Sequence, residues 1–160
     1  MDSNAYARLL APLLGPASAY ARLLMRNTAD AQDAVQQAAL RGWERIQQYD
    51  AARPFKGWWF AILRNCCFDM LRADRSRRNE PLDEFAHIPS ESSNPDLDLH
   101  SLEAALARLA TGHREILCMK YFADLTYDDL SEALAVPRGT IMSRLHTARK
   151  ALAVQLEEES

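Results

Sequence analysis

The chain has few of the residues that interrupt helices and no clear signal of strands. Glycine occurs only five times in 160 residues, no two glycines lie close together, and no β-branched alternating run is present. A glycine-rich phosphate loop is therefore excluded. The lack of alternation removes the usual signal of a β-strand. We expect an all-α fold.

Cysteine, histidine and long apolar runs are also scarce. Cys66, Cys67 and Cys118 are odd in number and have no C-x-x-C spacing, and the four histidines are scattered. This pattern indicates buried, reduced thiols, with no metal, no cofactor and no enzymatic activity. The longest low-charge stretch, residues 9–21, contains two prolines and a glycine and is too short to span a bilayer. No basic patch precedes an apolar run at the N-terminus. We therefore expect a cytoplasmic protein without membrane insertion.

The net charge differs strongly along the chain. Residues 1–80 carry 12 basic and 8 acidic side chains, residues 81–100 carry five acids and no Lys or Arg, and residues 101–160 carry 7 basic and 9 acidic side chains. A domain that binds DNA tightly by itself is usually basic. We therefore expect the free protein to bind duplex DNA poorly.

The helical patterns predict two small helical domains joined by an acidic flexible linker. Expected helices cover residues 4–14, 16–26, 28–49 and 54–77 in the first domain (residues 1–78). The segment 79–97 is rich in Pro, Ser and acids, as linkers are. Helices at 97–110 and 111–122 and two more form the second domain (98–156). The long helix is expected to be capped by Thr28 and to bury one face, which includes Ala31, Ala34, Val35, Ala38, Ala39, Gly42, Trp43 and Ile46.

The end of the chain has the pattern of a helix-turn-helix. Thr126 and Asp129 form a capping-box pair, and Pro137 suits the first turn of the next helix. That helix is expected to bury Ile141, Leu145, Ala148 and Leu152. An ordinary helical hairpin with a solvated face is the alternative. Acids are absent from residues 137–156, whereas solvated faces normally mix charges, and this favours binding in the DNA major groove.

Two segments resemble bacterial sigma factors of the extracytoplasmic-function (ECF) group. The segment LTYDDLSEALAVPRGTIMSRLHTARKAL is similar to their fourth conserved region. The segment NTADAQDAVQQAALRGWERIQQYDAARPFKGWWFAILRNCCFDMLR is similar to their second region. Together the resemblance covers residues 6–78 and 98–153. It implies a non-catalytic initiation subunit whose partners are core RNA polymerase, promoter DNA and an anti-sigma factor.

The resemblance also implies a polymerase-docking surface. In the family a D-x-V-Q pattern docks on the clamp coiled coil of the polymerase core, and its positions here are Asp33, Val35, Gln36 and Gln37. The family often has Glu where Gln37 stands, so part of the charge complementarity is expected to be missing. The alternative is that Asp33 only supports the helix dipole.

A second implied surface recognises and opens the minus-ten element. Flipped bases need a new surface, and aromatic stacking supplies about 1–3 kcal/mol per base. The candidates are Arg53, Phe55 and Lys56 in the loop, and Arg64, Asn65, Arg72 and Arg75 on the following helix. Trp58 matches a Trp of the family and is most simply a core residue, while Trp59 replaces a usual Leu. Such a pair resembles the DNA wedge of housekeeping sigma factors. We expect one ring in the core and one on DNA, with the assignment open; the alternative is that both rings are core residues.

The third implied surface reads the minus-thirty-five element. Its candidates are Arg138, Gly139, Thr140, Met142, Ser143, His146, Thr147, Arg149 and Lys150. Met142 and Thr147 stand where cations are common, so weaker duplex binding or a different preferred sequence is expected. At the turn, Ala135 replaces a usual Gly, which predicts slight strain. The rival function is a stand-alone regulator that binds duplex DNA as a dimer. Such a regulator needs a ligand or phosphoacceptor domain, which the N-terminal helices do not offer.

Overall fold

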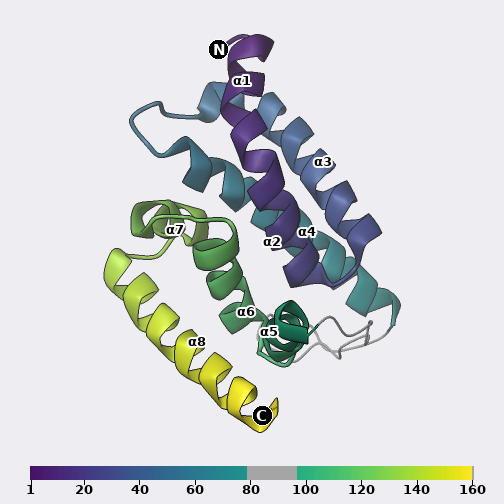
Figure 1. Cartoon of the computed structure of the whole chain (residues 1–160). Helices are drawn as coiled ribbons and strands as arrows, with labels where there is room; N and C mark the ends of the chain where they lie inside the picture. Colours follow the sequence, from purple (N-terminus) through teal and green to yellow (C-terminus); the bar gives the residue numbers. More distant parts are fainter. Residues whose placement is uncertain (79–96, 160) are drawn as a thin grey trace.

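The computed structural model describes residues 1–78 and 97–159, and these two parts are helical domains (Figure 1). The N-terminal domain contains α1 (Ser3–Leu10), the 3-10 turn η1 (Ala11–Leu13), α2 (Leu14–Met25), α3 (Thr28–Glu44), the 3-10 turn η2 (Ile46–Gln48) and α4 (Phe55–Arg77). The C-terminal domain contains α5 (Leu97–Ala107), α6 (Thr111–Leu117), the π-helical turn η3 (Cys118–Phe122), α7 (Tyr127–Leu134) and α8 (Arg138–Glu159). The all-α expectation is confirmed. The expected linker lies outside the described residues, apart from its last residue, Leu97.

The long helix α3 begins and ends differently from the sequence-based expectation. Asn27, not Thr28, is the N-cap, because its side-chain oxygen accepts a hydrogen bond from the Asp30 amide at 3.0 Å. The helix ends at Glu44 instead of Tyr49. The expected burial of Trp43 was wrong, because this residue is 39% exposed. Its ring contacts the Tyr6 ring, with centroids 5.6 Å apart.

Trp59 is the largest side chain in the core, with 0% exposure. Its ring packs edge-on against Phe60 at 5.7 Å between centroids. Gly42 on α3 makes room for it, because an added Cβ would stand 3.0 Å from two Trp59 ring atoms and would collide with the Tyr6 hydroxyl. The closeness of α3 and α4 therefore depends on a residue without a side chain at Gly42.

The helix-turn-helix of the C-terminal domain is present as the sequence predicts. Ile141, Leu145 and Ala148 are completely buried on α8, and Leu152 is half-buried. They pack against other buried residues of the domain, among them Leu125 and Leu130. The helix expected over 111–122 is regular only to Leu117 and continues as the π-helical turn.

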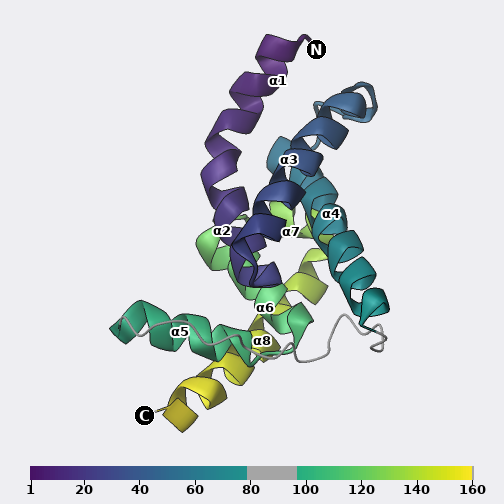
Figure 2. The ribbon, with the colours of Figure 1, turned by 90° about the vertical axis from the view of Figure 1, so that its right-hand side faces the viewer.

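The two domains pack directly against each other. Helix α7 lies along the N-terminal half of α4, and α2 contacts α6 and η3 (Figures 1 and 2). The contact between α4 and α7 is close at Gly57, where an added Cβ would stand 2.7 Å from the Asp129 carbonyl oxygen and 2.8 Å from Glu132 Cβ. The buried residues of both domains form one continuous cluster.

Candidate nucleic-acid and polymerase interfaces

An aromatic cluster stands at the start of α4, formed by Tyr49, Phe55 and Trp58. Their ring centroids are 5.1 to 5.8 Å apart. The loop before the cluster is fixed by the Tyr49 hydroxyl, which donates to the Arg53 carbonyl at 2.7 Å. Phe55 and Trp58 are only half-buried. Trp59 is therefore the fully buried core ring of the tryptophan pair, whereas Trp58 is partly buried and packs against the core.

Two cations beside this aromatic cluster are bound by the C-terminal domain. Nη2 of Arg53 lies 2.9 and 3.0 Å from the two carboxylate oxygens of Glu132 on α7. Nζ of Lys56 donates to the backbone carbonyl of Asp124 at 3.2 Å. Both of these candidate minus-ten residues are thus in contact with the helix-turn-helix domain.

A third candidate cation, Arg64, belongs to a buried polar cluster between the domains. Its Nε donates to Oε2 of Glu115 on α6 at 2.9 Å, and the Tyr20 hydroxyl donates to the same oxygen at 2.9 Å. Burial is the main cause that raises the pKa of Tyr20 well above its usual value, and the charge of Glu115 adds to the effect. Sequence reasoning did not identify Glu115. The available signal was the position of this Glu directly before the apolar run 116–119.

The remaining candidates on α4 differ in exposure. Asn65 and Arg72 are exposed, whereas Arg75 is buried and is not presented to a ligand in this arrangement. The guanidinium groups of Arg64 and Arg72 both lie over the Phe68 ring, 4.6 and 5.9 Å from its centroid. Both arginines are therefore held on one aromatic ring of α4, and Arg72 also pairs with Asp69.

Buried thiols lie in both domains, as expected. Cys66, Cys67 and Cys118 are free and buried. Burial raises the pKa of the Cys118 thiol to about 12 and raises that of Cys67 further. Neutral, desolvated thiols are poor nucleophiles. The thiols therefore serve packing.

The raised pKa values of the buried thiols predict a loss of stability at alkaline pH. A thiol pKa that is higher in the folded than in the unfolded chain contributes stability that is complete below the unfolded value of about 8.5 and declines above it. We expect the free energy of unfolding to fall by about 1 kcal/mol per thiol between pH 7.5 and 9.5. Urea titrations at the two pH values measure this. Burial lowers the pKa of Arg114 to about 10. Loss of the Arg114 proton would raise the free energy of unfolding, but only at pH values above this range. Equal free energies of unfolding at pH 7.5 and pH 9.5 would contradict the prediction.

The helix-turn-helix shows the capping box expected at the start of α7 and the strain expected at the turn between α7 and α8. The Thr126 amide donates to Asp129 Oδ2 at 3.0 Å and the Asp129 amide donates to Thr126 Oγ1 at 3.1 Å, which confirms the capping box. Ala135 has φ 55°, in the left-handed region that favours Gly. The Val136 amide donates to the Ser131 carbonyl and helps to hold this turn.

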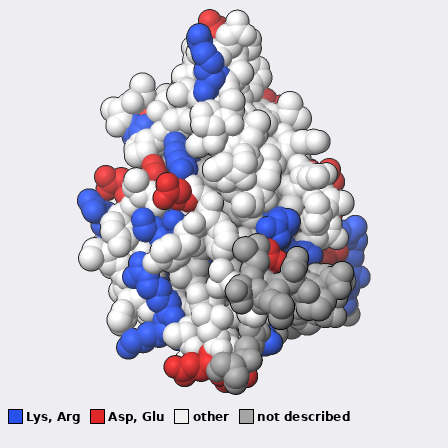
Figure 3. Space-filling view, viewed as in Figure 1, with Lys and Arg blue, Asp and Glu red and all other residues white. Residues whose placement is uncertain are grey.

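The candidate minus-thirty-five residues lie along α8, and two of them, Ser143 and Thr147, face a cleft toward α4 and α6. All of them except the half-buried Thr140 are exposed, and Lys and Arg side chains gather along the edge that α8 forms (Figure 3). Met142 is 54% exposed, which leaves an apolar side chain in the middle of this face. Two of the cations have partners inside the domain: Arg149 Nε donates to the Tyr121 hydroxyl at 2.6 Å, and Arg138 lies 3.4 Å from Asp128.

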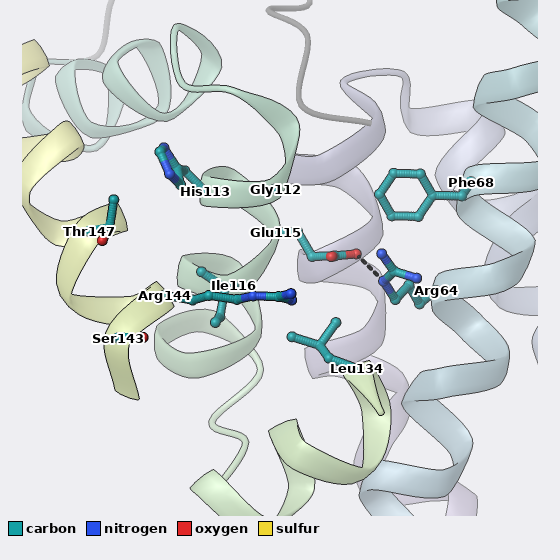
Figure 4. A pocket seen from close by; sticks show the side chains of 10 residues that line it. All are labelled: Arg64, Phe68, Gly112, His113, Glu115, Ile116, Leu134, Ser143, Arg144 and Thr147. Carbon is teal, nitrogen blue, oxygen red and sulfur yellow. Dashed lines mark hydrogen bonds and ion pairs between the residues drawn. The ribbon is translucent and has the colours of Figure 1, made fainter. Parts of the chain in front are cut away.

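A cleft of about 210 Å³ lies between α4, α6 and α8. The Arg64–Glu115 ion pair forms part of one wall, and Arg144 extends from α8 across the cleft toward this pair (Figure 4). Ser143 and Thr147 of the candidate reading face also line it. The cleft thus brings residues expected at two promoter elements to opposite sides of one space.

The outer face of α3 presents the candidate polymerase-docking residues. Asp33, Gln36 and Gln37 are exposed, while Val35 is buried in the core. Leu40 is 65% exposed and continues the same face. Sequence reasoning did not identify Leu40, although its distance of seven residues from Asp33 places it on that face. We call Asp33, Gln36, Gln37 and Leu40 the α3 stripe.

Comparisons with known proteins define the class of this fold. Residues 8–77 match the family Sigma-70 region 2, and residues 99–152 match Sigma-70, region 4. The chain is 33% identical to ECF RNA polymerase sigma factor SigL of Mycobacterium tuberculosis, over 87% of this chain and 81% of that protein. It is 26% identical to SigW of Bacillus subtilis, over 84% and 80% of the two chains. The chain belongs to the ECF group of RNA polymerase sigma factors.

Solved structures agree with this membership. The sigma factor RpoE in complex with the anti-sigma factor NepR from Bartonella quintana superposes with a TM-score of 0.77 and 25% identity, over 96% of this chain and 98% of that chain. CnrH in complex with the cytosolic domain of CnrY shares the fold, with a TM-score of 0.76 over 99% and 92% of the chains at 23% identity. The dimeric regulator is not favoured. Within residues 1–78 and 97–159, no helix is both long and apolar enough to cross a bilayer.

Proposed function

We propose that this sigma factor uses three separate surfaces during initiation. The α3 stripe docks on the clamp coiled coil of core polymerase. The start of α4 opens the minus-ten element, and the outer face of α8 reads the minus-thirty-five element in the major groove. All of this requires binding only, so the protein acts as a non-catalytic subunit.

The minus-ten assignment rests on the different burial of the two adjacent tryptophans, Trp58 and Trp59. Trp59 is sealed in the core, whereas Trp58 keeps part of its ring exposed at the start of α4. Arg53 and Lys56 precede this ring, and Phe55 packs on it. An exposed ring next to cations suits an unstacked base with its phosphate backbone.

The direct test is reconstitution with bacterial core RNA polymerase. The purified protein should co-elute with core and direct run-off transcription from a subset of a genomic promoter library. Trp58→Ala should lower the yield of open complexes about tenfold, which corresponds to the loss of one stacking interaction. Trp58→Tyr, which retains a ring, is the matched control. Full promoter opening by Trp58→Ala would contradict the proposed stacking of Trp58 on an unstacked base. A wild-type chain that does not bind core polymerase would contradict the assignment of the α3 stripe.

We also propose a partner and a location for the free protein on the basis of its family. The two solved relatives described above are complexes with an anti-sigma factor and with a cytosolic domain, respectively. We propose that a protein of the anti-sigma class holds this chain inactive, and that it works in the cytoplasm with the polymerase. The test is co-purification of an untagged partner with the tagged chain from cells in which the chain directs no transcription. Recovery of the tagged chain without such a partner would contradict the proposal.

A further inference from the structure

One surface contact of α8 is not explained by the three proposed surfaces. Arg149 Nε donates to the Tyr121 hydroxyl at 2.6 Å, and the guanidinium carbon lies 5.6 Å from the centre of the Tyr121 ring. This hydrogen bond is the main cause that raises the pKa of Arg149, and a hydrogen bond with Tyr127 adds to it. Tyr121 is 55% exposed and Arg149 is exposed as well, so the contact contributes little to the apolar core.

Arg149 lies at the border of the buried face of α8. It is 11 residues from Arg138, about three helical turns, so the two arginines lie on the same side of the helix. Leu145, one turn before Arg149, is completely buried. When a recognition helix enters the major groove, side chains near the middle of its outer face reach base edges, and those on its flanks meet the phosphate backbone. Arg149 is thus placed to bind a phosphate.

The partner of Arg149 differs in charge from the partner of Arg138. Arg138 lies 3.4 Å from the carboxylate of Asp128, which offsets its charge and competes with phosphate for the same donors. The Tyr121 hydroxyl is neutral, so it holds Arg149 without offsetting the positive charge. Its bond uses the Nε–H group. The two Nη groups, which bind a phosphate in a bidentate fashion, are not consumed by this bond.

The π-helical turn η3 holds Tyr121 in place. The Ala123 amide donates to the Cys118 carbonyl at 3.0 Å, a bond that spans five residues and closes a wider turn than an α-helix has. Cys118 and Met119 are completely buried and anchor the turn in the core, whereas Tyr121 lies at the surface. The hydroxyl is therefore carried by a fixed element, and its bond restricts the longer and more flexible arginine side chain.

We propose that Tyr121 is a positioning residue for promoter recognition: its hydroxyl fixes the Arg149 guanidinium in advance for a phosphate at the edge of the minus-thirty-five element. The inference rests on the proposed function of α8 and adds to it a residue outside the recognition helix. An arginine loses rotamer freedom when it binds a phosphate. If the hydroxyl has already restricted that freedom, DNA binding costs less, and we expect a gain of about fivefold in affinity.

The experiment uses holoenzyme, reconstituted from core polymerase and the full chain, and a fluorescein-labelled promoter duplex obtained from the run-off library. Anisotropy gives the dissociation constant at several salt concentrations, at a low temperature at which the duplex stays closed. The chains are the wild type, Tyr121→Phe, Arg149→Ala and the double variant. Tyr121→Phe removes only the hydroxyl and keeps the ring, so all chains should melt near the wild-type temperature.

The expected result is a loss that depends on Arg149. Tyr121→Phe should bind about fivefold more weakly, with an unchanged salt dependence because the cation is still present. Arg149→Ala should reduce the slope of log K against log salt by about 0.9, the value for one phosphate contact. The double variant should bind no more weakly than Arg149→Ala. A purely structural role of Tyr121 would instead add its loss to that of Arg149→Ala.

The remaining outcomes separate this inference from the proposed function. Equal affinity of Tyr121→Phe and the wild type would overturn the positioning role, and so would a further fivefold loss in the double variant. Wild-type affinity and salt slope of Arg149→Ala would exclude Arg149 from the DNA surface, and the inference would fail while the rest of α8 stayed assigned. If wild-type holoenzyme bound a promoter with a scrambled minus-thirty-five element as tightly as the intact one, the proposed reading by α8 would itself be overturned, and the inference with it.

Discussion

Replacing Trp59 by Ala should lower the free energy of unfolding by about 3–5 kcal/mol, the range for a large aromatic residue removed from a core. The ring is completely buried and fills the space that Gly42 leaves between α3 and α4. Little of this volume can be recovered, because the surrounding residues already form a continuous core. Urea denaturation followed by far-UV circular dichroism measures the change.

The neighbouring residue supplies the control for this prediction. Trp58→Ala removes a ring of the same size from a half-exposed position and should cost clearly less stability. The two variants should also differ in function. Trp58→Ala loses promoter opening while it remains folded, whereas Trp59→Ala loses the fold first. A greater loss of stability for Trp58→Ala would show that the two rings exchange their roles.

Leu40→Asp should weaken binding to core polymerase by about 30-fold, or about 2 kcal/mol, the threshold for an interface hot spot. The side chain is 65% exposed on the α3 stripe, so its replacement should not unfold the free protein. At the interface an apolar contact would be replaced by a carboxylate that must be desolvated without a partner. Competition binding to core against a labelled wild-type chain measures the effect.

An exposed Leu elsewhere on the same domain serves as the matched control. Leu14 is 40% exposed at the start of α2, outside the α3 stripe, and Leu14→Asp should leave core affinity unchanged. Both variants should melt near the wild-type temperature. Wild-type affinity of Leu40→Asp for core would exclude Leu40 from the docking surface.

The local features of this chain could be predicted from sequence because they depend on neighbouring residues. The capping box at Thr126 and the buried face of α8 follow from spacings of three and four residues. Trp43 was misplaced because its position borders the buried face of α3, and periodicity alone does not fix that edge. The tryptophan pair was left open for the same reason. Only the packing of α3 against α4 decides that Trp59 is the core ring.

The packing of the two domains could not be predicted from local patterns. Tyr20 and Glu115 are 95 residues apart in the chain, and no periodicity connects them. Gly57 offered no local signal either, because its close neighbours belong to α7. The expected linker 79–97 lies outside the described residues, apart from Leu97, and stays a prediction.

The α3 stripe is exposed while the two domains are packed against each other. Asp33, Gln36, Gln37 and Leu40 are accessible while α7 still covers the start of α4. Docking on polymerase through this stripe, as proposed, would therefore not require the two domains to separate first.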